Sequence, residues 1–209
     1  MTEQKSMHNP SIDIHQLGLG DYKKMLWKNG KGYTYQIARQ DNPQGDDFVW
    51  RISMADVTED GEFSYFHDKK RLLSVLSGQG LTLDIDGKIQ QLPYQKVCAF
   101  DGDSHVYSRL MADSVRDLNL IYDANKLNGE MFWLDELEED FALPKTDLIF
   151  IFNADAKIEL MLKDGDITKN YTLEQYDSLK LNHISQTIFL QKQQLNHPLA
   201  VIILNDLQN

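Results

Sequence analysis

Residues 48–85 read FVWRISMADVTEDGEFSYFHDKKRLLSVLSGQGLTLDI, and this stretch decides the fold. Alternating and β-branched residues predict a strand over 48–57. Residues 71–76 and 79–85 then predict a strand pair that is interrupted at Gly78. Short strands separated by turn residues are typical of sandwiches and barrels, so we expect an all-β fold.

The strand predicted at 48–57 presents two faces of different chemistry. Because successive side chains of a strand point to opposite sides, Trp50 and Met54 share one face, and Arg51 and Ser53 share the other. The sequence leaves open which of these faces looks into a barrel. If the polar face does, the interior is a ligand cavity and not a packed core.

The same rhythm of short strands occurs twice along the chain. We predict a first half over residues 11–122 and a second half over 147–209. Between them, residues 123–146 include the acidic run at 135–140, which predicts a solvated short helix or linker. Residues 1–10 are polar, and we expect them to be disordered.

The composition excludes several classes of function. The chain has 209 residues and a formal net charge of −11, and phosphate binding needs clustered lysine and arginine, so we expect no nucleic-acid partner. The acidic charge also disfavours anionic membranes, and no apolar run is long enough to span a bilayer. Cys98 is the only cysteine and the N-terminus lacks an apolar segment, so we expect a cytoplasmic protein.

The region around residues 78–93 resembles the hairpin that joins the two motifs of a cupin barrel. Cupins bind a divalent metal through two His and one Glu of the first motif and one His of the second. Here His67 stands near the first ligand place, but Lys69 takes the second place, no Glu follows, and His105 is out of register. Because a metal needs three or more converging ligands, we predict no metal and no cofactor, and expect His67 at the surface or rim.

A more specific resemblance is carried by four motifs in order. They are WKNGKGYT at 27–34, FVWRISMA at 48–55, DGEFS at 60–64, and the segment that runs from Arg71 to Gly78. Together they resemble the HutD/Ves family, whose pattern is W-x-N-G-G-G-x-T, then W-R-x-S-x-A, then G-x-F-S-x-F-x-G with an Arg soon after. The match covers about the first 120 residues, and the rest matches only in its strand rhythm.

The resemblance implies a bicupin fold, with two cupin-like β-barrel or β-sandwich halves in one chain. The family is similar to proteins encoded with histidine-degradation enzymes or described as stress-associated, and no catalytic activity is established for it. Two departures lie near the expected pocket mouth. Lys31 replaces the middle glycine of the loop, and His67-Asp68 replaces the usual Pro-Gly.

The predicted site is a pocket for a small carboxylate. Arg51 and Arg71 can each hold a carboxylate through two parallel hydrogen bonds, and the alternative is that each pairs with an internal acid such as Asp117. Trp27 and Trp50 either line the pocket or fill the core. The predicted ligand-binding residues are Trp27, Asn29, Gly30, Thr34, Trp50, Arg51, Ser53, Phe63, Phe66, Arg71, Asp117 and Asn119.

We therefore expect a non-catalytic protein that binds a small carboxylate metabolite and senses or limits flux through amino-acid catabolism, as the resemblance to histidine-utilisation proteins implies. One alternative is a cupin-type isomerase or hydrolase in which Asp117 or His67 acts as a general base near Arg71. Another is a protein-interaction module, such as a homodimer formed through exposed sheet edges.

Overall fold

The computed structural model confirms the all-β fold. It describes residues 13–27, 30, 32–45, 47–134, 140–192 and 197–207. Within these ranges every regular element is a strand, and no helix that could cross a membrane is found there. The predictions for residues 1–10, for Asn29 and for the acidic residues 135–139 lie outside the described residues.

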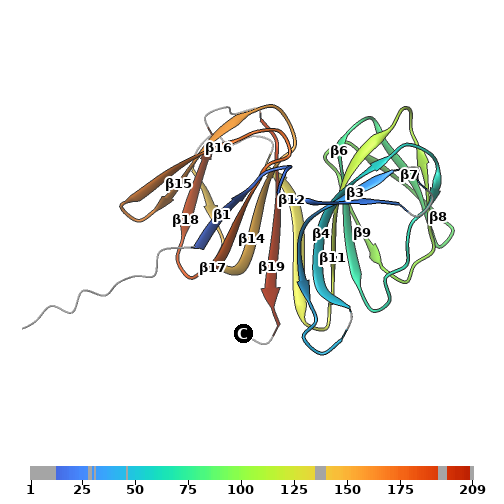
Figure 1. Ribbon diagram of the computed structural model, residues 1–209, viewed down its shortest axis with the longest axis horizontal. Helices are drawn as coiled ribbons and strands as arrows, with labels where there is room; N and C mark the ends of the chain where they lie inside the picture. The colour runs from blue at the N-terminus through green and yellow to red at the C-terminus, as the bar shows by residue number, and fades with distance from the viewer. Residues whose placement is uncertain are drawn as a thin grey trace, which may run out of the picture.

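The first half consists of two antiparallel sheets (Figure 1). The larger sheet has the order β2 (Lys23–Leu26), β3 (Tyr33–Asp41), β4 (Phe48–Val57), β11 (Val115–Tyr122), β6 (Lys70–Ser77) and β9 (Val97–Asp101). The smaller sheet has the order β5 (Gly61–Glu62), β10 (Val106–Leu110), β7 (Gly80–Ile85) and β8 (Lys88–Pro93). The β7–β8 hairpin turns at Asp86 and Gly87, which have φ of 51° and 83°. Asp-Gly suits the positive φ that both positions of such a turn require.

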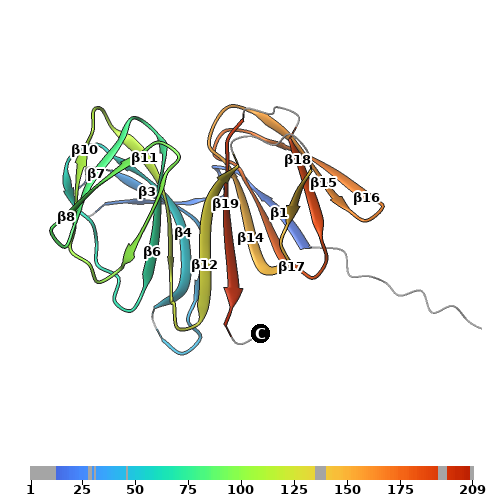
Figure 2. The same cartoon turned by 180° about the vertical axis from the view of Figure 1, so that it is seen from behind.

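The second half repeats this arrangement of a larger and a smaller sheet. The larger sheet has the order β1 (Asp13–Leu17), β17 (Ser178–Ile184), β14 (Thr146–Asn153), β19 (Leu199–Asp206) and β12 (Leu127–Leu134). The smaller sheet has the order β13 (Phe141–Leu143), β18 (Ile188–Lys192), β15 (Ile158–Asp164) and β16 (Ile167–Leu173). Figures 1 and 2 show the two halves side by side, with β12 at their junction.

Two of the predicted boundaries are corrected. Residues 123–146 are not only a linker, because they contain β12 and β13, and β12 pairs with β19 along its whole length. The first strand, β1, does not belong to the first half, because it pairs with β17 of the second half. Neither strand has a clear alternation of apolar and polar residues, since both lie at the edge of their sheet.

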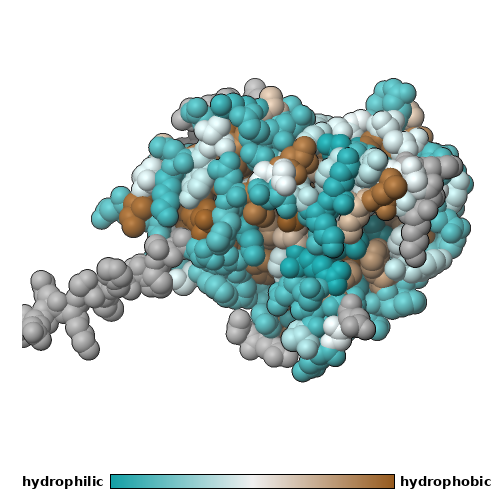
Figure 3. Space-filling view, viewed as in Figure 1, coloured by the Kyte–Doolittle hydropathy of each residue, from teal (hydrophilic) through white to brown (hydrophobic). Residues whose placement is uncertain are grey.

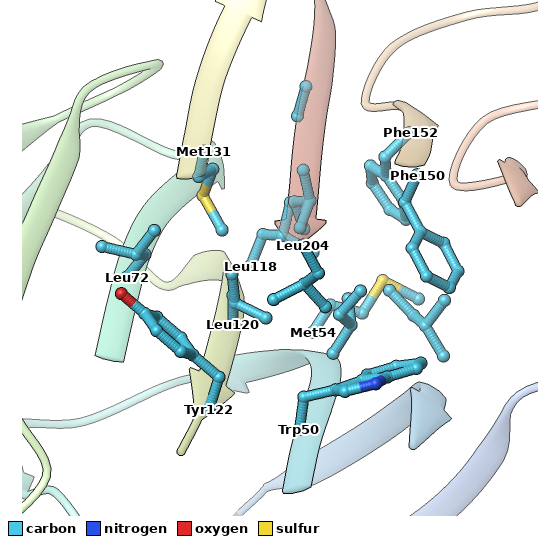
Figure 4. Packing of buried hydrophobic residues seen from close by; sticks show 14 of the residues in the cluster. Trp50, Met54, Leu72, Leu118, Leu120, Tyr122, Met131, Phe150, Phe152 and Leu204 are labelled. Carbon is cyan, nitrogen blue, oxygen red and sulfur yellow. The ribbon is translucent and has the colours of Figure 1, made fainter. Parts of the chain in front are cut away.

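Three apolar cores hold the four sheets together. The first-half core joins Leu73 and Val75 of the larger sheet to Leu81 and Leu83 of the smaller sheet. The second-half core is its counterpart. The joint core lies between the two larger sheets, and Figure 4 shows part of it. In this core Trp50 packs edge-on against Phe150, with ring centroids 6.0 Å apart. The halves therefore share a buried interface, to which both larger sheets contribute one face.

The face of the molecule drawn in Figure 3 is mainly polar. On the face drawn in Figure 3, hydrophobic atoms occur in small separated groups among hydrophilic ones. Single exposed apolar residues of this kind are normal on soluble proteins and do not by themselves mark a binding site.

Candidate functional site

The interior of the first half contains a cavity of about 400 Å³, which we call the arginine cavity. Arg51, Ser53 and Ala55 of β4 line it, whereas Trp50 and Met54 point the other way, into the joint core. The polar face of β4 is therefore the inner one. The residues that line the arginine cavity are Met25, Leu26, Trp27, Thr34, Arg51, Ser53, Ala55, Val57, Glu62, Phe63, Ser64, Phe66, Arg71, Asp117, Asn119 and Ile121.

The strand register brings the two arginines together. Ile121 of β11 pairs with Arg51 of β4 on one side and with Arg71 of β6 on the other. Neighbouring strands are about 4.8 Å apart, so the two arginine backbones are about 10 Å apart on one face of the sheet. Long guanidinium side chains can converge across this distance on a ligand between them.

Arg71 is the most deeply placed cation of the cavity. The residue is 6% exposed, and its Nη2 donates to Oδ1 of Asn119 at 2.7 Å, while Nη1 donates to the carbonyl of Ser64 at 3.2 Å. The Nε atom is buried and has no hydrogen-bond partner among the described residues. Burial lowers the pKa of Arg71 to about 10, so the guanidinium remains charged at neutral pH.

Arg51 has a similar environment on the opposite side. Its Nε atom is also buried without a hydrogen-bond partner among the described residues, and burial lowers its pKa. The Phe66 ring lies between the two cations, with its centroid 4.9 Å from the Arg51 guanidinium carbon and 5.4 Å from that of Arg71. The ring therefore stacks on both guanidinium groups without neutralising either one.

Asp117 supplies a buried carboxyl group beneath the arginines. Burial raises its pKa to about 7, although the charge of Arg71 acts in the opposite direction. Asn119 connects the two, because its Nδ2 donates to Oδ1 of Asp117 at 2.7 Å while its Oδ1 accepts from Arg71. Of the ion pairs found among the described residues, none joins Asp117 to Arg51 or Arg71. Arg71 thus reaches the internal acid only through an amide.

The apolar walls come from the loop and strand ends at the cavity mouth. Trp27 donates from its indole Nε1 to Oγ1 of Thr34 at 2.9 Å, which fixes the ring against the end of β3. Gly32 allows this arrangement, since a Cβ there would lie 2.9 Å from the Trp27 ring. Phe63 completes the wall, 5.0 Å from the Arg71 guanidinium carbon. The sequence predicted these groups from their aromatic and hydroxyl chemistry.

Two predicted site residues are placed elsewhere. Trp50 is corrected: it is 5% exposed in the joint core, and its Nε1 donates to Oε1 of Gln40. Gly30 is exposed in the loop and does not line the arginine cavity. In turn, the sequence missed the carbonyl group of Ser64, because backbone contacts leave no signal in residue type. It also missed Phe100, whose ring centroid is 5.0 Å from the Arg71 guanidinium carbon.

His67 and His105 lie outside the arginine cavity. The His67 side chain is 86% exposed and contacts Asp103 with its Nδ1 at 2.5 Å, so the proposal of a His67 base near Arg71 is corrected. His105 is also exposed, with Nε2 3.4 Å from Glu62. Among the described residues, no group of three His, Cys, Asp or Glu side chains is placed to hold a metal ion. Two guanidinium groups beside one carboxyl do not fit a divalent cation.

The chemistry of the arginine cavity suits an anion. It has two cations, Arg71 buried and Arg51 half-buried, and each has a buried Nε donor without a partner among the described residues. The Phe66 ring lies between them, and hydroxyl and amide groups also line the cavity. A carboxylate accepts parallel hydrogen bonds from a guanidinium group, and exclusion of water makes each such bond stronger.

Comparisons with a family model, with a related sequence and with a solved structure all point to the same family. The family model described as HutD matches residues 19–197. An uncharacterized 21.2 kDa protein in the hutC 3' region of Pseudomonas putida is 33% identical over 175 residues, which cover 83% of this chain and 89% of that protein. The solved structure of HutD from Pseudomonas fluorescens SBW25, in a formate condition, has a TM-score of 0.78 and 28% identity, covering 93% of this chain and 99% of that one.

More distant solved structures share the fold alone. A mutant of Bacillus subtilis oxalate decarboxylase has a TM-score of 0.62 at 7% identity, and the alignment covers 91% of this chain and 76% of that one. This likeness supports the cupin-like architecture that the sequence led us to expect, and it carries no information on ligand or reaction.

Proposed function

Since this chain belongs to the HutD family, we propose that its arginine cavity binds a small carboxylate metabolite and that binding serves to sense or limit histidine utilisation in the cytoplasm. The family is linked to histidine-utilisation genes, and the names of the Pseudomonas relatives reflect this link. The cavity supports the ligand chemistry and the family supports the pathway, so each part can be tested separately.

One observation carries the ligand proposal. Arg51 and Arg71 each keep a buried Nε atom without a hydrogen-bond partner among the described residues. A buried donor without an acceptor costs about 1–3 kcal/mol, and more when the group is charged. A carboxylate between the two arginines removes this cost, while Phe63 and Phe66 shield its apolar part from water.

The test is a thermal-shift screen against intermediates of histidine degradation and other small carboxylates. A ligand that binds only the folded protein raises the melting temperature, by on the order of 5 °C at a hundredfold excess over Kd. The shift should disappear in Arg71→Ala and in Arg51→Ala. Arg109→Ala is the matched control, because Arg109 is exposed and lies outside the cavity.

The two variants also separate binding from stability. If Arg71→Ala remains folded by circular dichroism and loses the ligand shift, the arginine contributes to binding. A variant that keeps the full shift would contradict the proposal. If no carboxylate raises the melting temperature of the wild-type protein, the result favours a protein-interaction module.

An enzyme remains the second candidate because of one observation. Asp117 lines the same cavity and has its pKa raised to about 7, which suits a general base or acid at neutral pH. Any carboxylate that binds should therefore be incubated with the protein and followed by NMR. Turnover that is lost in Asp117→Asn while binding persists would favour an isomerase or hydrolase over a sensor.

A further inference from the structure

A second cavity, of about 610 Å³, lies where the two halves meet, and we call it the junction cavity. The first half contributes Gln40 and Trp50, and the second half contributes Leu148, Lys180 and Leu204. It shares no lining residue with the arginine cavity. Its volume falls within the range of about 300–1,000 Å³ that is usual for ligand sites, which often form between domains.

The floor of the junction cavity is the apolar rim of the joint core. Trp50, Leu148 and Leu204 are all less than 9% exposed and belong to that core. Figure 4 shows Trp50, Phe150 and Leu204 together in this region, between β4 and the larger sheet of the second half. The Trp50 indole is held in place by Gln40 at 2.6 Å and by Phe150. The floor is therefore apolar and held rigidly by its packing, and each of its residues exposes a small part of its surface to the cavity.

The polar wall is contributed by two lysines. Lys180 pairs with Phe150 across the strands, so it lies on the sheet face that is turned towards the first half. It is half-buried, and no hydrogen bond or ion pair of its ammonium group with another described residue is found. Among the described residues, the polar contacts of the Lys126 ammonium group are long, with Asn42 Oδ1 at 3.5 Å and Asp123 Oδ2 at 4.0 Å. Both ammonium groups thus retain free donors at the cavity.

Two acidic residues, Asp147 and Asp206, line the cavity as well, and both already interact with other groups. Asp147 Oδ2 accepts the backbone N–H of Asp206 at 2.8 Å. The side-chain amide of Asn182, which lies two residues after Lys180 on β17, donates to Oδ2 of Asp13 on β1. Of the charged groups that line the cavity, Lys180 is therefore the one most in need of a counterion.

We propose that the junction cavity is a second binding site, which takes an organic anion with a flat apolar body. The aromatic or aliphatic body lies on the Trp50 floor, and the anionic group is bound by Lys180 and Lys126. The apolar floor disfavours a small hydrated anion, which would leave it uncovered, and the lysines disfavour a neutral ligand, which would leave Lys180 without a counterion. This proposal does not depend on the function proposed for the arginine cavity.

The three tryptophans of the chain provide a test that separates the two sites. Trp50 lines the junction cavity, Trp27 lines the arginine cavity, and Trp133 lines neither. Protein labelled with 5-fluorotryptophan gives one ¹⁹F resonance for each, and each is assigned from the corresponding Trp→Phe variant. The probes are phenylacetate, 4-hydroxybenzoate and indole-3-acetate, with phenylacetamide as the uncharged control.

We expect at least one of the three anions to shift the Trp50 resonance saturably in the millimolar range, with Trp133 unchanged. In Arg71→Ala, which removes the carboxylate site of the arginine cavity, the Trp27 resonance should be unchanged as well. Lys180→Ala should weaken this binding by on the order of tenfold, the usual effect of losing one charged hydrogen bond. Lys180→Arg should restore it. Lys157→Ala is the matched control, since Lys157 is an exposed lysine of the same half that lies outside the cavity.

Three results would overturn the proposal. They are no saturable shift of Trp50 with any of the three anions, a shift of Trp27 alone, and equal affinity in the wild type and a folded Lys180→Ala. Circular dichroism confirms the fold of each variant, and Lys180→Gln replaces Lys180→Ala if the latter is unstable. Arg71→Ala should leave the Trp50 response unchanged, so a failure at one site does not imply a failure at the other.

Discussion

The two halves use similar larger sheets but fill their interiors differently. In the first half, the inner face of β4 presents Arg51 and Ser53 to a cavity. In the second half, the inner face of β14 presents Ile149 and Ile151, both 0% exposed, to an aliphatic core. The outer faces of both strands are apolar, because both pack into the joint core.

The difference shows how a strand can combine two tasks. Since alternate residues point to opposite sides, β4 keeps its contact with the second half through Trp50 and Met54 while its other face forms a ligand cavity. In the second half, the place that corresponds to the arginine cavity is filled by a continuous aliphatic core. We infer that it stabilises the first half, whose interior is interrupted by buried charge.

The strongest test of this contrast introduces a charge into the aliphatic interior. Ile151→Arg places an unpaired cation in the second-half core, at a cost of roughly 5 kcal/mol or more, which is comparable to the whole stability of a typical domain. We expect the variant to be unfolded or insoluble, as measured by circular dichroism and soluble yield. Ile167→Arg, at a position that is 53% exposed, should change stability by less than about 0.5 kcal/mol. A folded Ile151→Arg with an unchanged urea midpoint would refute the contrast.

A pair of truncations compares the interiors without new charge. Ile151→Ala should cost about 3 kcal/mol, because it leaves a void in a dry core. Ser53→Ala should cost less than about 1 kcal/mol, because the side chain is small and already borders a cavity. Urea unfolding of both variants measures the difference. Equal losses would mean that the first-half interior is as tightly packed as the second.

The smallest expected effect concerns the pH dependence of the first half. Asp117 has a pKa of about 7 in the folded protein, raised from 3.8, so the folded state retains a proton that the unfolded state releases. Its ionisation therefore lowers the free energy of unfolding as pH rises from about 4 to 7. Asp117→Asn should remove on the order of 2 kcal/mol of this fall, measured by urea unfolding at pH 5 and pH 8.

Asp113→Asn is the control for that measurement, because Asp113 is exposed and no hydrogen bond or ion pair is found for it among the described residues. Its pH dependence should match that of the wild type. If Asp117→Asn also matches the wild type, Asp117 is not protonated near neutral pH in the folded protein, and its role as a titrating group in the cavity is excluded.

The sequence was most informative where local chemistry determines structure. The alternation over residues 48–57 grouped Arg51 with Ser53 correctly, and Arg71 stands out as the guanidinium that opens the next strand, with the family pattern as further support. It could not decide which face of β4 is inner, because that depends on Phe150 and its neighbours, which lie about 100 residues later and cover Trp50. A partner so distant in sequence leaves no mark on the strand itself.

The predicted boundaries between the halves were wrong for a related reason. Edge strands such as β1 and β12 have only one neighbour and partly exposed faces, so their burial does not impose a regular pattern. The sequence 127–134 contains Gly129 and Glu130 beside apolar residues, so by itself it predicts part of a linker. Its assignment to a strand depends on pairing with β19, which comes at the very end of the described chain.

The path of β1 determines how the chain can be divided. Asn182 of β17 bonds to Asp13 of β1, 169 positions earlier, so the ribosome makes the first strand long before its partner emerges. One cut between the halves, anywhere from 123 to 126, leaves β1 on one fragment and its sheet on the other. The halves therefore resemble each other in architecture but are not exchangeable modules, and gene fusions or fragments based on a two-part division would each carry an unpaired strand edge.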